Sequence, residues 1–385
     1  MLTMPVVRLR ILPALLVGVV LINGRFLRAD EPESQPAQYE LDDFVISAAS
    51  ADEPARPTFS LPEALAYLER GALAWTKKRD CVSCHTNGSY MLVRPALTPF
   101  VGKPSETMRH FFVETIEKFR DRDHEKNLAG VRPTQMAYVA AGLAEWDARV
   151  TGKLSAETDA ALRLMFKLQS EEGSWGNADC WPPLESSVYH GTCVASMAVA
   201  AAPNWLNELE DAELLVSVDK MKTYLRTVSP PHDYARVLLL WASARLPGLL
   251  EEGRQPELIE TVFSHQRSDG GWSIRTFAAP EAWGRGNRAE KLREEPNFAD
   301  PDSDGHQTGL AVVVLREAGV PADDPRIRRA VAWLLANQRE SGRWWTRSLN
   351  TDKYHFITYS GTCYPLLALA KCGALPEQQA DNKAP

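Results

Sequence analysis

The chain has 385 residues, of which 44% are hydrophobic and 24% charged, so a largely disordered protein is excluded. This length allows one large or two medium domains. The formal net charge of −7 argues against nucleic acid or an anionic lipid surface as the main partner.

The N-terminus has the pattern of a signal peptide. Arg8 and Arg10 precede an apolar run over 11–22, and Ala29 then offers a small residue for cleavage. The run is too short to span a bilayer as a stable helix, although an uncleaved anchor is the alternative. We predict a signal peptide over 1–29 and export to the periplasm. Cleavage changes the net charge from −7 to −11, and no later stretch is long enough for an integral membrane span.

Composition divides the rest of the chain into four segments. Residues 30–58 are rich in Asp, Glu, Pro, Ala and Ser, and we expect an acidic disordered tether there. A helical segment over 59–104 carries a Cys-x-x-Cys-His motif. Helical periodicity dominates over 105–375, followed by a tail over 376–385, so the predicted fold class is all-α.

Three internal repeats indicate how the helices are arranged. Each repeat ends a helical run with Gln and places Trp six residues later, at Gln169 and Trp175, Gln266 and Trp272, and Gln338 and Trp344. An amphipathic helix precedes each loop and an almost wholly apolar helix follows it. Five to six such hairpins predict an α/α toroid with inner and outer helix rings. We expect Gln to cap helix ends and Trp to pack across the loop, which would tie neighbouring hairpins together.

These loops, as in "HQRSDGGW" and "NQRESGRW", resemble the QW motifs of squalene-hopene cyclases and of the wider terpene cyclase and protein prenyltransferase superfamily. The resemblance covers roughly residues 105–372 and implies the toroid. Similar Gln-x-x-x-Gly-Gly-Trp loops occur in polysaccharide lyases of α/α-barrel type. The resemblance therefore implies two alternative functions. One is a cyclase-like or lyase-like enzyme, and the other is the binding of an apolar, isoprenoid-like ligand.

Squalene-hopene cyclases use an Asp-x-Asp-Asp-Thr-Ala motif to protonate an alkene, and the comparable stretch here runs over 300–309. Aligned on Asp302 and Asp304, the third acid is Gly305, while aligned on Thr308 the acids become His306 and Gln307. Asp302, Asp304 and His306 are the candidate catalytic residues that this resemblance implies. The stretch also opens like a calcium loop, but Ala311 stands at the position of the bidentate Glu, so a helix-capping loop is the preferred interpretation. The prenyltransferase zinc site has no counterpart, because no Asp-x-Cys occurs.

The sequence "CVSCH" over 81–85 is the sharpest chemical motif. In c-type haem proteins two such thiols attach the haem and the adjacent His ligates its iron, so Cys81 and Cys84 are candidate attachment residues and His85 the candidate axial ligand. Covalent haem attachment takes place in the periplasm, and the predicted export would bring the chain there. A zinc site, a disulfide and a chance match are the alternatives. Because the segment is short, we expect the haem on an extra helical element docked on the toroid. Candidate sixth iron ligands downstream are Met91, Met108, His110 and His124.

Other cysteines and histidines have weaker assignments. Cys180 with Cys193, or Cys363 with Cys372, are disulfide candidates, with buried thiols as the alternative. Four histidines and three tyrosines fall near starts of inner helices, where we expect them either to converge on a cavity mouth or to cap helices: His190, His232, His306, His355, Tyr189, Tyr234 and Tyr359. Together these features predict an exported haem protein that is redox-active, has an apolar ligand and engages a periplasmic redox partner. A haem-independent cyclase-like or lyase-like enzyme and a structural repeat module are the alternatives.

Overall fold

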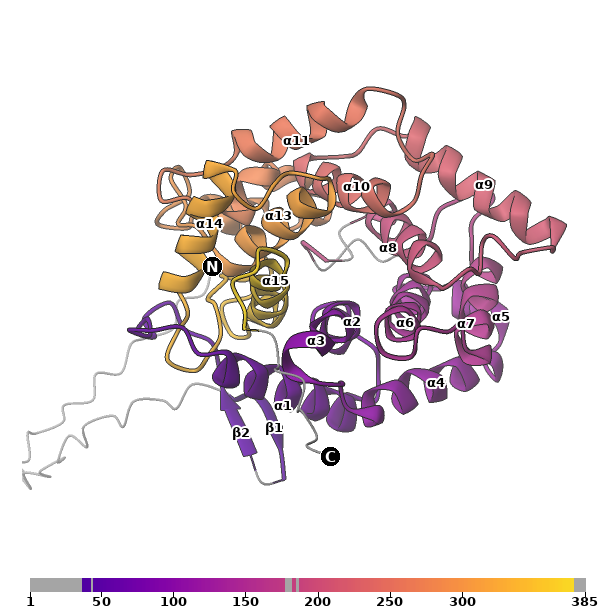
Figure 1. The fold of residues 1–385 in the computed structure, drawn as a ribbon, viewed down its shortest axis with the longest axis horizontal. Coiled ribbons are helices and arrows are strands. Elements are labelled where there is room, and N and C mark those ends of the chain that lie inside the picture. Colours follow the sequence, from indigo (N-terminus) through magenta and orange to yellow (C-terminus); the bar gives the residue numbers. More distant parts are fainter. Residues whose placement is uncertain (1–36, 43, 177–181, 185–186, 377–385) are drawn as a thin grey trace, which may run out of the picture. The chain divides into compact units, whose positions relative to one another are not determined.

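Two concentric rings of helices form the core of the fold in the computed structural model (Figure 1). The structure describes residues 37–42, 44–176, 182–184 and 187–376. The predicted signal peptide and Cys180 lie outside these residues. The chain divides into a unit at Met1–Gln35 and a compact unit at Pro36–Pro385, and the second unit contains all of the described residues.

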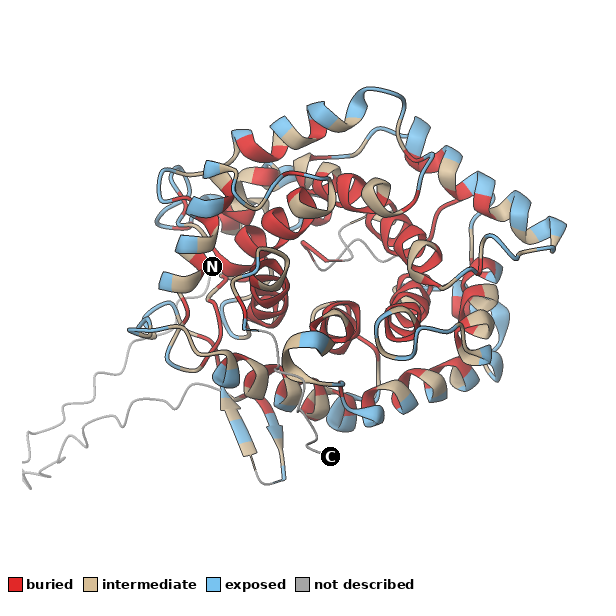
Figure 2. Ribbon diagram, in the orientation of Figure 1, coloured by how far each residue is buried: buried red, intermediate tan, exposed pale blue. Residues whose placement is uncertain are grey.

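The inner ring consists of helices that are buried nearly all round, as their Ala-, Val- and Leu-rich sequences require (Figure 2). In the described residues they are α2 (Asn87–Val93), α6 (Arg132–Trp146), α8 (Val188–Ala201), α10 (Asp233–Arg245), α13 (Gly305–Glu317) and α15 (Ile357–Lys371). Each contacts the next, and α15 contacts α2, so the inner ring is closed. The predicted α/α toroid is confirmed, with six hairpins in the described residues.

The outer ring consists of amphipathic helices: α1 (Leu61–Arg79), α4 (Glu106–Arg120), α7 (Ala156–Lys167), α9 (Ala212–Thr227), α11 (Arg254–Ser264) and α14 (Pro325–Ala336). In α4, for example, Met108, Phe111, Phe112, Ile116 and Phe119 share one buried face. Ser or Asp side chains accept a first-turn backbone N–H and so start most of these helices, at Ser60, Ser105, Ser155, Asp211 and Asp324.

Short elements connect the hairpins. They are the helices α3 (Thr98–Val101), α5 (His124–Leu128) and α12 (Ala289–Arg293), the 3₁₀ helices η1 (Arg94–Leu97), η3 (Ile274–Phe277) and η4 (Pro280–Gly286), and the π-helix η2 (Asp147–Thr151). None of the helices among the described residues is long and apolar enough to cross a membrane.

Each of the three QW-type loops bonds its own hairpin to the next one in the ring. Gln169 Nε2 donates to the backbone oxygen of Ser217 in α9 at 2.9 Å, and Gln266 Nε2 donates to that of Arg326 in α14 at 2.8 Å. The three Trp indoles donate back to their own outer helices at 2.8 Å, as Trp344 does to Leu334 O. The expected tie between neighbouring hairpins is therefore confirmed for Gln, whereas each Trp ties its loop to the outer helix of its own hairpin.

The third loop closes the ring. Gln338 Nε2 donates to Ser60 O at 2.9 Å, and Ser60 N donates to Gln338 Oε1 at 2.6 Å, which joins the last hairpin to the start of α1. Gly342 has φ of +86°, and a Cβ there would lie 2.4 Å from the Glu63 carbonyl carbon. Only glycine satisfies both the left-handed backbone and this close approach.

The described part of the segment expected to be a disordered tether, residues 37–42 and 44–58, is instead ordered and covers this seam. Strands β1 (Ala37–Leu41) and β2 (Phe44–Ser47) form an antiparallel hairpin, and Tyr39 is buried against Tyr359, with 5.9 Å between ring centroids. Buried Arg343 of the last loop donates to Gln38 Oε1 at 3.1 Å and pairs with Glu53 at 3.1 Å. This packing could not be predicted from the acidic, Pro-containing composition. The segment is held by a few side chains whose partners lie some 300 residues away, and such contacts produce no local periodicity.

A second difference concerns residues 59–104. These residues do not form an extra element docked on the toroid, because α1 and α2 are the outer and inner helices of its first hairpin (Figure 1). Helix α2 has only seven residues, all of them buried, and short turns follow it. A helix of this length is too short to be recognised as an inner helix from the periodicity of its sequence.

Buried histidine and tyrosine pairs occupy the inner ring. The Tyr138 hydroxyl lies 2.8 Å from His190 Nε2, and the Tyr234 hydroxyl lies 3.1 Å from His306 Nε2. His306 Nδ1 lies 2.8 Å from Ser360 Oγ. Burial lowers the pKa of both histidines to about 3, so both rings are neutral at pH 7.

We predict that Gln338→Ala lowers the free energy of unfolding by about 2 kcal/mol, because it removes buried hydrogen bonds across the seam. Asn337→Ala is the matched control, since the Asn337 amide donates only to Trp333 of its own helix, and about 0.5 kcal/mol is expected. Urea unfolding measures both. Equal effects of the two substitutions would contradict the closing role of Gln338.

Stability should fall in acid because of His306. The unfolded chain protonates this residue below pH 6.5 while the folded ring stays neutral down to about 3, so stability is present at pH 7 and is lost as the pH falls between those values. Between pH 7 and pH 5 the loss is about 2 kcal/mol per buried histidine. His306→Gln should remove that part of the pH dependence, whereas exposed His124→Gln should leave it unchanged, as urea unfolding at both pH values would show.

Candidate functional site

The Cys-x-x-Cys-His residues form the loop between α1 and α2, and side chains of α2 fix the loop backbone. Asn87 Oδ1 accepts from Ser83 N at 2.7 Å, and Asn87 Nδ2 donates to Cys81 O at 3.0 Å. Ser89 Oγ donates to Cys84 O at 2.6 Å. These bonds hold both cysteine backbones in one conformation, so the loop is a preorganised element.

His85 lies between aromatic rings. Its imidazole stacks on Phe356 with 5.1 Å between centroids and meets the edge of Trp75 at 4.6 Å. This desolvation lowers the pKa of His85 to about 3, which keeps the ring neutral at pH 7. Nδ1 lies 2.7 Å from Thr86 Oγ1, and the described residues provide no hydrogen-bond partner for Nε2. A neutral imidazole with one nitrogen held by a neighbour is the state in which His ligates a metal.

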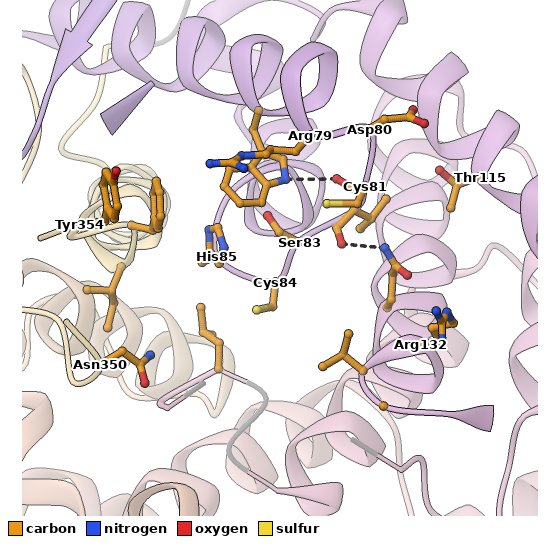
Figure 3. A pocket seen from close by; sticks show the side chains of 18 of the residues that line it. Arg79, Asp80, Cys81, Ser83, Cys84, His85, Thr115, Arg132, Asn350 and Tyr354 are labelled. Atoms are coloured by element: carbon orange, nitrogen blue, oxygen red, sulfur yellow. Dashed lines mark hydrogen bonds between the residues drawn. The ribbon is translucent and has the colours of Figure 1, made fainter. Parts of the chain in front are cut away.

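These residues line a large pocket of about 910 Å³ (Figure 3). Its wall includes the motif over 81–85, the segment after α4, the start of α6 and the loop before α15. The aromatic residues of the wall are Trp75, Phe119, Tyr354 and Phe356. Residues of the first, second and last hairpins thus line the pocket, and its volume and apolar lining suit a sizeable organic ligand.

The three candidate catalytic residues do not line this pocket. Asp302 is exposed. Asp304 is buried and caps α13, where it accepts from Gln307 N at 2.8 Å and Ile274 N at 2.7 Å. Burial raises the pKa of Asp304 to about 6. His306 lies in the buried network described above, so the structure does not bring Asp302 together with the other two, and their catalytic role stays a prediction.

The alternative metal sites gain no geometric support. Asp300 pairs with Arg267, Asp302 accepts from Asn297, and Asp304 caps a helix, so the three acids of the calcium-like loop point to different partners. Among the described residues no group of three or more His, Cys, Asp or Glu side chains is arranged to hold a metal ion. A haem-iron site is a different case, because the protein supplies only one or two ligands to the iron.

The remaining histidines mostly have structural partners. His232 caps α10 by accepting from Ala235 N at 3.1 Å, and His355 accepts from Ser348 N at 3.0 Å in the loop that lines the pocket. His190, His232 and His306 lie around the Tyr234 ring, at 6.4, 6.2 and 6.0 Å between ring centroids, but none of the four histidines lines the pocket. The candidate sixth ligands also lie off the pocket wall: Met91 and Met108 are buried, whereas His110 and His124 are exposed.

Two disulfide predictions can be compared with the structure. Cys193, Cys363 and Cys372 are free thiols, so Cys363 and Cys372 are not bridged, while Cys180, the other predicted partner of Cys193, lies outside the described residues. Burial raises the pKa of the Cys193, Cys363 and Cys372 thiols. These three residues are thus protonated and pack as small apolar side chains, which was the alternative interpretation.

Sequence reasoning missed the aromatic and cationic wall of the pocket. Tyr354 and Phe356 lie far from the motif along the chain and line the same pocket because the closed ring brings α15 beside α2, whereas Arg132 comes from the neighbouring helix α6. Tyr354 and Phe356 directly precede an apolar helix, as the QW loops do. This position in the sequence could have indicated that they lie near the end of an inner helix.

Comparisons with known proteins agree with the fold. Residues 251–374 match the model of the squalene-hopene cyclase C-terminal domain family, while no curated protein matches the chain. Similar solved structures include a wild-type glycosidase, at 13% identity and a TM-score of 0.50, and a glycosidase variant in complex with glucose, at 14% identity and a TM-score of 0.50. Each alignment covers 75% of this chain and 87% of the other. The chain is therefore a toroid whose C-terminal part is similar to squalene-hopene cyclases.

Proposed function

We propose that this chain is an exported protein that carries one covalent haem at the mouth of the toroid. Cys81 and Cys84 would attach the haem and His85 would ligate its iron. The observation that carries the proposal is that all three residues line one pocket, with a neutral His85 whose Nε2 has no hydrogen-bond partner among the described residues. Haem held there supplies one-electron redox chemistry.

The residues present fit this group. The preorganised loop presents the motif, and Thr86 fixes the His85 ring through Nδ1, as neighbours of metal-bound imidazoles do. Aromatic side chains provide faces for a planar macrocycle, and positively charged residues lie on the same wall. In the described part of the wall no second His and no Met is found, which favours an open iron position that binds small molecules.

An apolar, isoprenoid-like ligand beside the haem is a further part of the proposal. Its support is the apolar wall and the similarity of residues 251–374 to a cyclase domain. A redox role would also need a periplasmic electron-transfer partner.

The alternative is a haem-independent cyclase-like, lyase-like or glycosidase-like enzyme. Glycosidases of the ordinary type need two carboxyl groups that flank the scissile bond. Among the described residues that line the pocket, Asp80 is the one carboxylate, and Lys118 Nζ lies 2.5 Å from it. The pocket thus favours the haem proposal over acid and base hydrolysis.

The first experiment tests attachment. Full-length protein co-expressed with a cytochrome c maturation system should keep haem colour after denaturation and electrophoresis. Cys81→Ala and Cys84→Ala should each remove one of the two thioether bonds, and the double variant should lose the stain completely. Cys372→Ala, outside the pocket, is the matched control and should stain like the wild type. A colourless wild-type band would overturn the proposal.

The second experiment tests the axial ligand. His85→Ala should change the visible absorption spectrum of the matured protein, because it removes a nitrogen ligand from the iron. His124→Ala and Met108→Ala, at two of the candidate positions for the sixth ligand, should leave the spectrum unchanged. A spectrum that responds to either of those substitutions instead would contradict the open position.

A further inference from the structure

The pocket wall carries positive charge that the protein does not neutralise. Lys118, Arg79, Arg122 and Arg132 line it, whereas Asp80 is the one acid among the described lining residues and is paired with Lys118. No carboxylate partner is found for the three arginines in the described part of the chain. The whole sequence has a net charge of −7, so a cationic pocket is a local departure that indicates an anionic ligand group.

Two of these arginines lie at the same edge of the pocket. Arg122 Nη1 donates to Asn127 Oδ1 at 3.3 Å, and Arg132 Nη1 donates to Lys126 O at 3.0 Å, so both are held by the short helix α5. Arg122 also lies over the Phe119 ring, 5.2 Å from its centroid. Among the described residues neither arginine uses Nε or Nη2, so each has donors left that match a carboxylate.

We infer that Arg122 and Arg132 bind two carboxylate groups at the rim of an otherwise apolar ligand, as the two propionates of a haem would provide. The inference rests on the proposed function for the identity of the ligand. Its geometric basis is separate, because the cations line the pocket independently of the cysteine motif. Two guanidinium groups at one edge, together with the aromatic faces of the wall, would orient a porphyrin with its acidic edge toward α5.

The test uses full-length protein made without haem maturation and two probes, protoporphyrin IX and its dimethyl ester. The two probes have the same macrocycle and differ in the two carboxylates. Binding, followed by the change in the porphyrin absorption band, should be stronger for the free acid by at least about tenfold, the factor that corresponds to one charge-assisted contact. Arg122→Gln and Arg132→Gln should each weaken free-acid binding about tenfold and leave ester binding unchanged.

Arg328→Gln is the matched control. Arg328 is an exposed residue of α14 outside the pocket, and its substitution by Gln removes the same charge. It should leave the affinity for both probes unchanged, and Arg132→Lys should restore only part of the preference, since an ammonium lacks the planar fork. Equal binding of acid and ester by the wild type would overturn the inference, as would equal losses with Arg328→Gln.

The outcomes separate this inference from the haem proposal. A colourless wild type that still prefers the free acid through Arg122 and Arg132 would remove covalent haem attachment and keep the carboxylate site. A stained wild type without that preference would keep the haem and remove the site.

Discussion

Ring closure is the constraint on which the rest of the structure depends. Each inner helix is buried on all sides only because it has a neighbour on both flanks, and the first and last helices would lack one if the array stayed open. The seam between α15 and α2 therefore needs dedicated contacts. The Gln338 side chain, the close approach of Gly342 to α1 and the hairpin of β1 and β2 provide them.

Closure also creates the candidate site. His85 belongs to the first hairpin, and the Phe356 ring on which it stacks belongs to the last. Trp75 and Phe356 also meet across the seam, with 5.4 Å between ring centroids. The low pKa of His85 follows from its desolvation in this aromatic enclosure, so the neutral state of the imidazole is a property of the closed ring rather than of the motif alone.

The sequence made the toroid predictable because Gln and Trp recur at a constant spacing and each has one physical task. It did not make the seam predictable, because residues 37–58 act through isolated anchors such as Tyr39 and Glu53, whose partners are distant in sequence. The cyclase-like acids show the same limit. An Asp before an inner helix has the same sequence context whether it caps the helix or protonates a substrate, and Asp304 caps the helix.

The uncompensated cations of the pocket connect stability with function. Arg79, Arg122 and Arg132 share one wall without a carboxylate partner among the described residues, and neighbouring like charges destabilise a folded protein. An acidic chain could readily have placed acids beside them, as it did for Arg343, which pairs with Glu53 at the seam. Arg343 at the seam is neutralised by an acid, whereas Arg122 and Arg132 of the pocket make no hydrogen bond through Nε or Nη2 among the described residues. This difference is typical of groups whose charge is matched only when a ligand is bound.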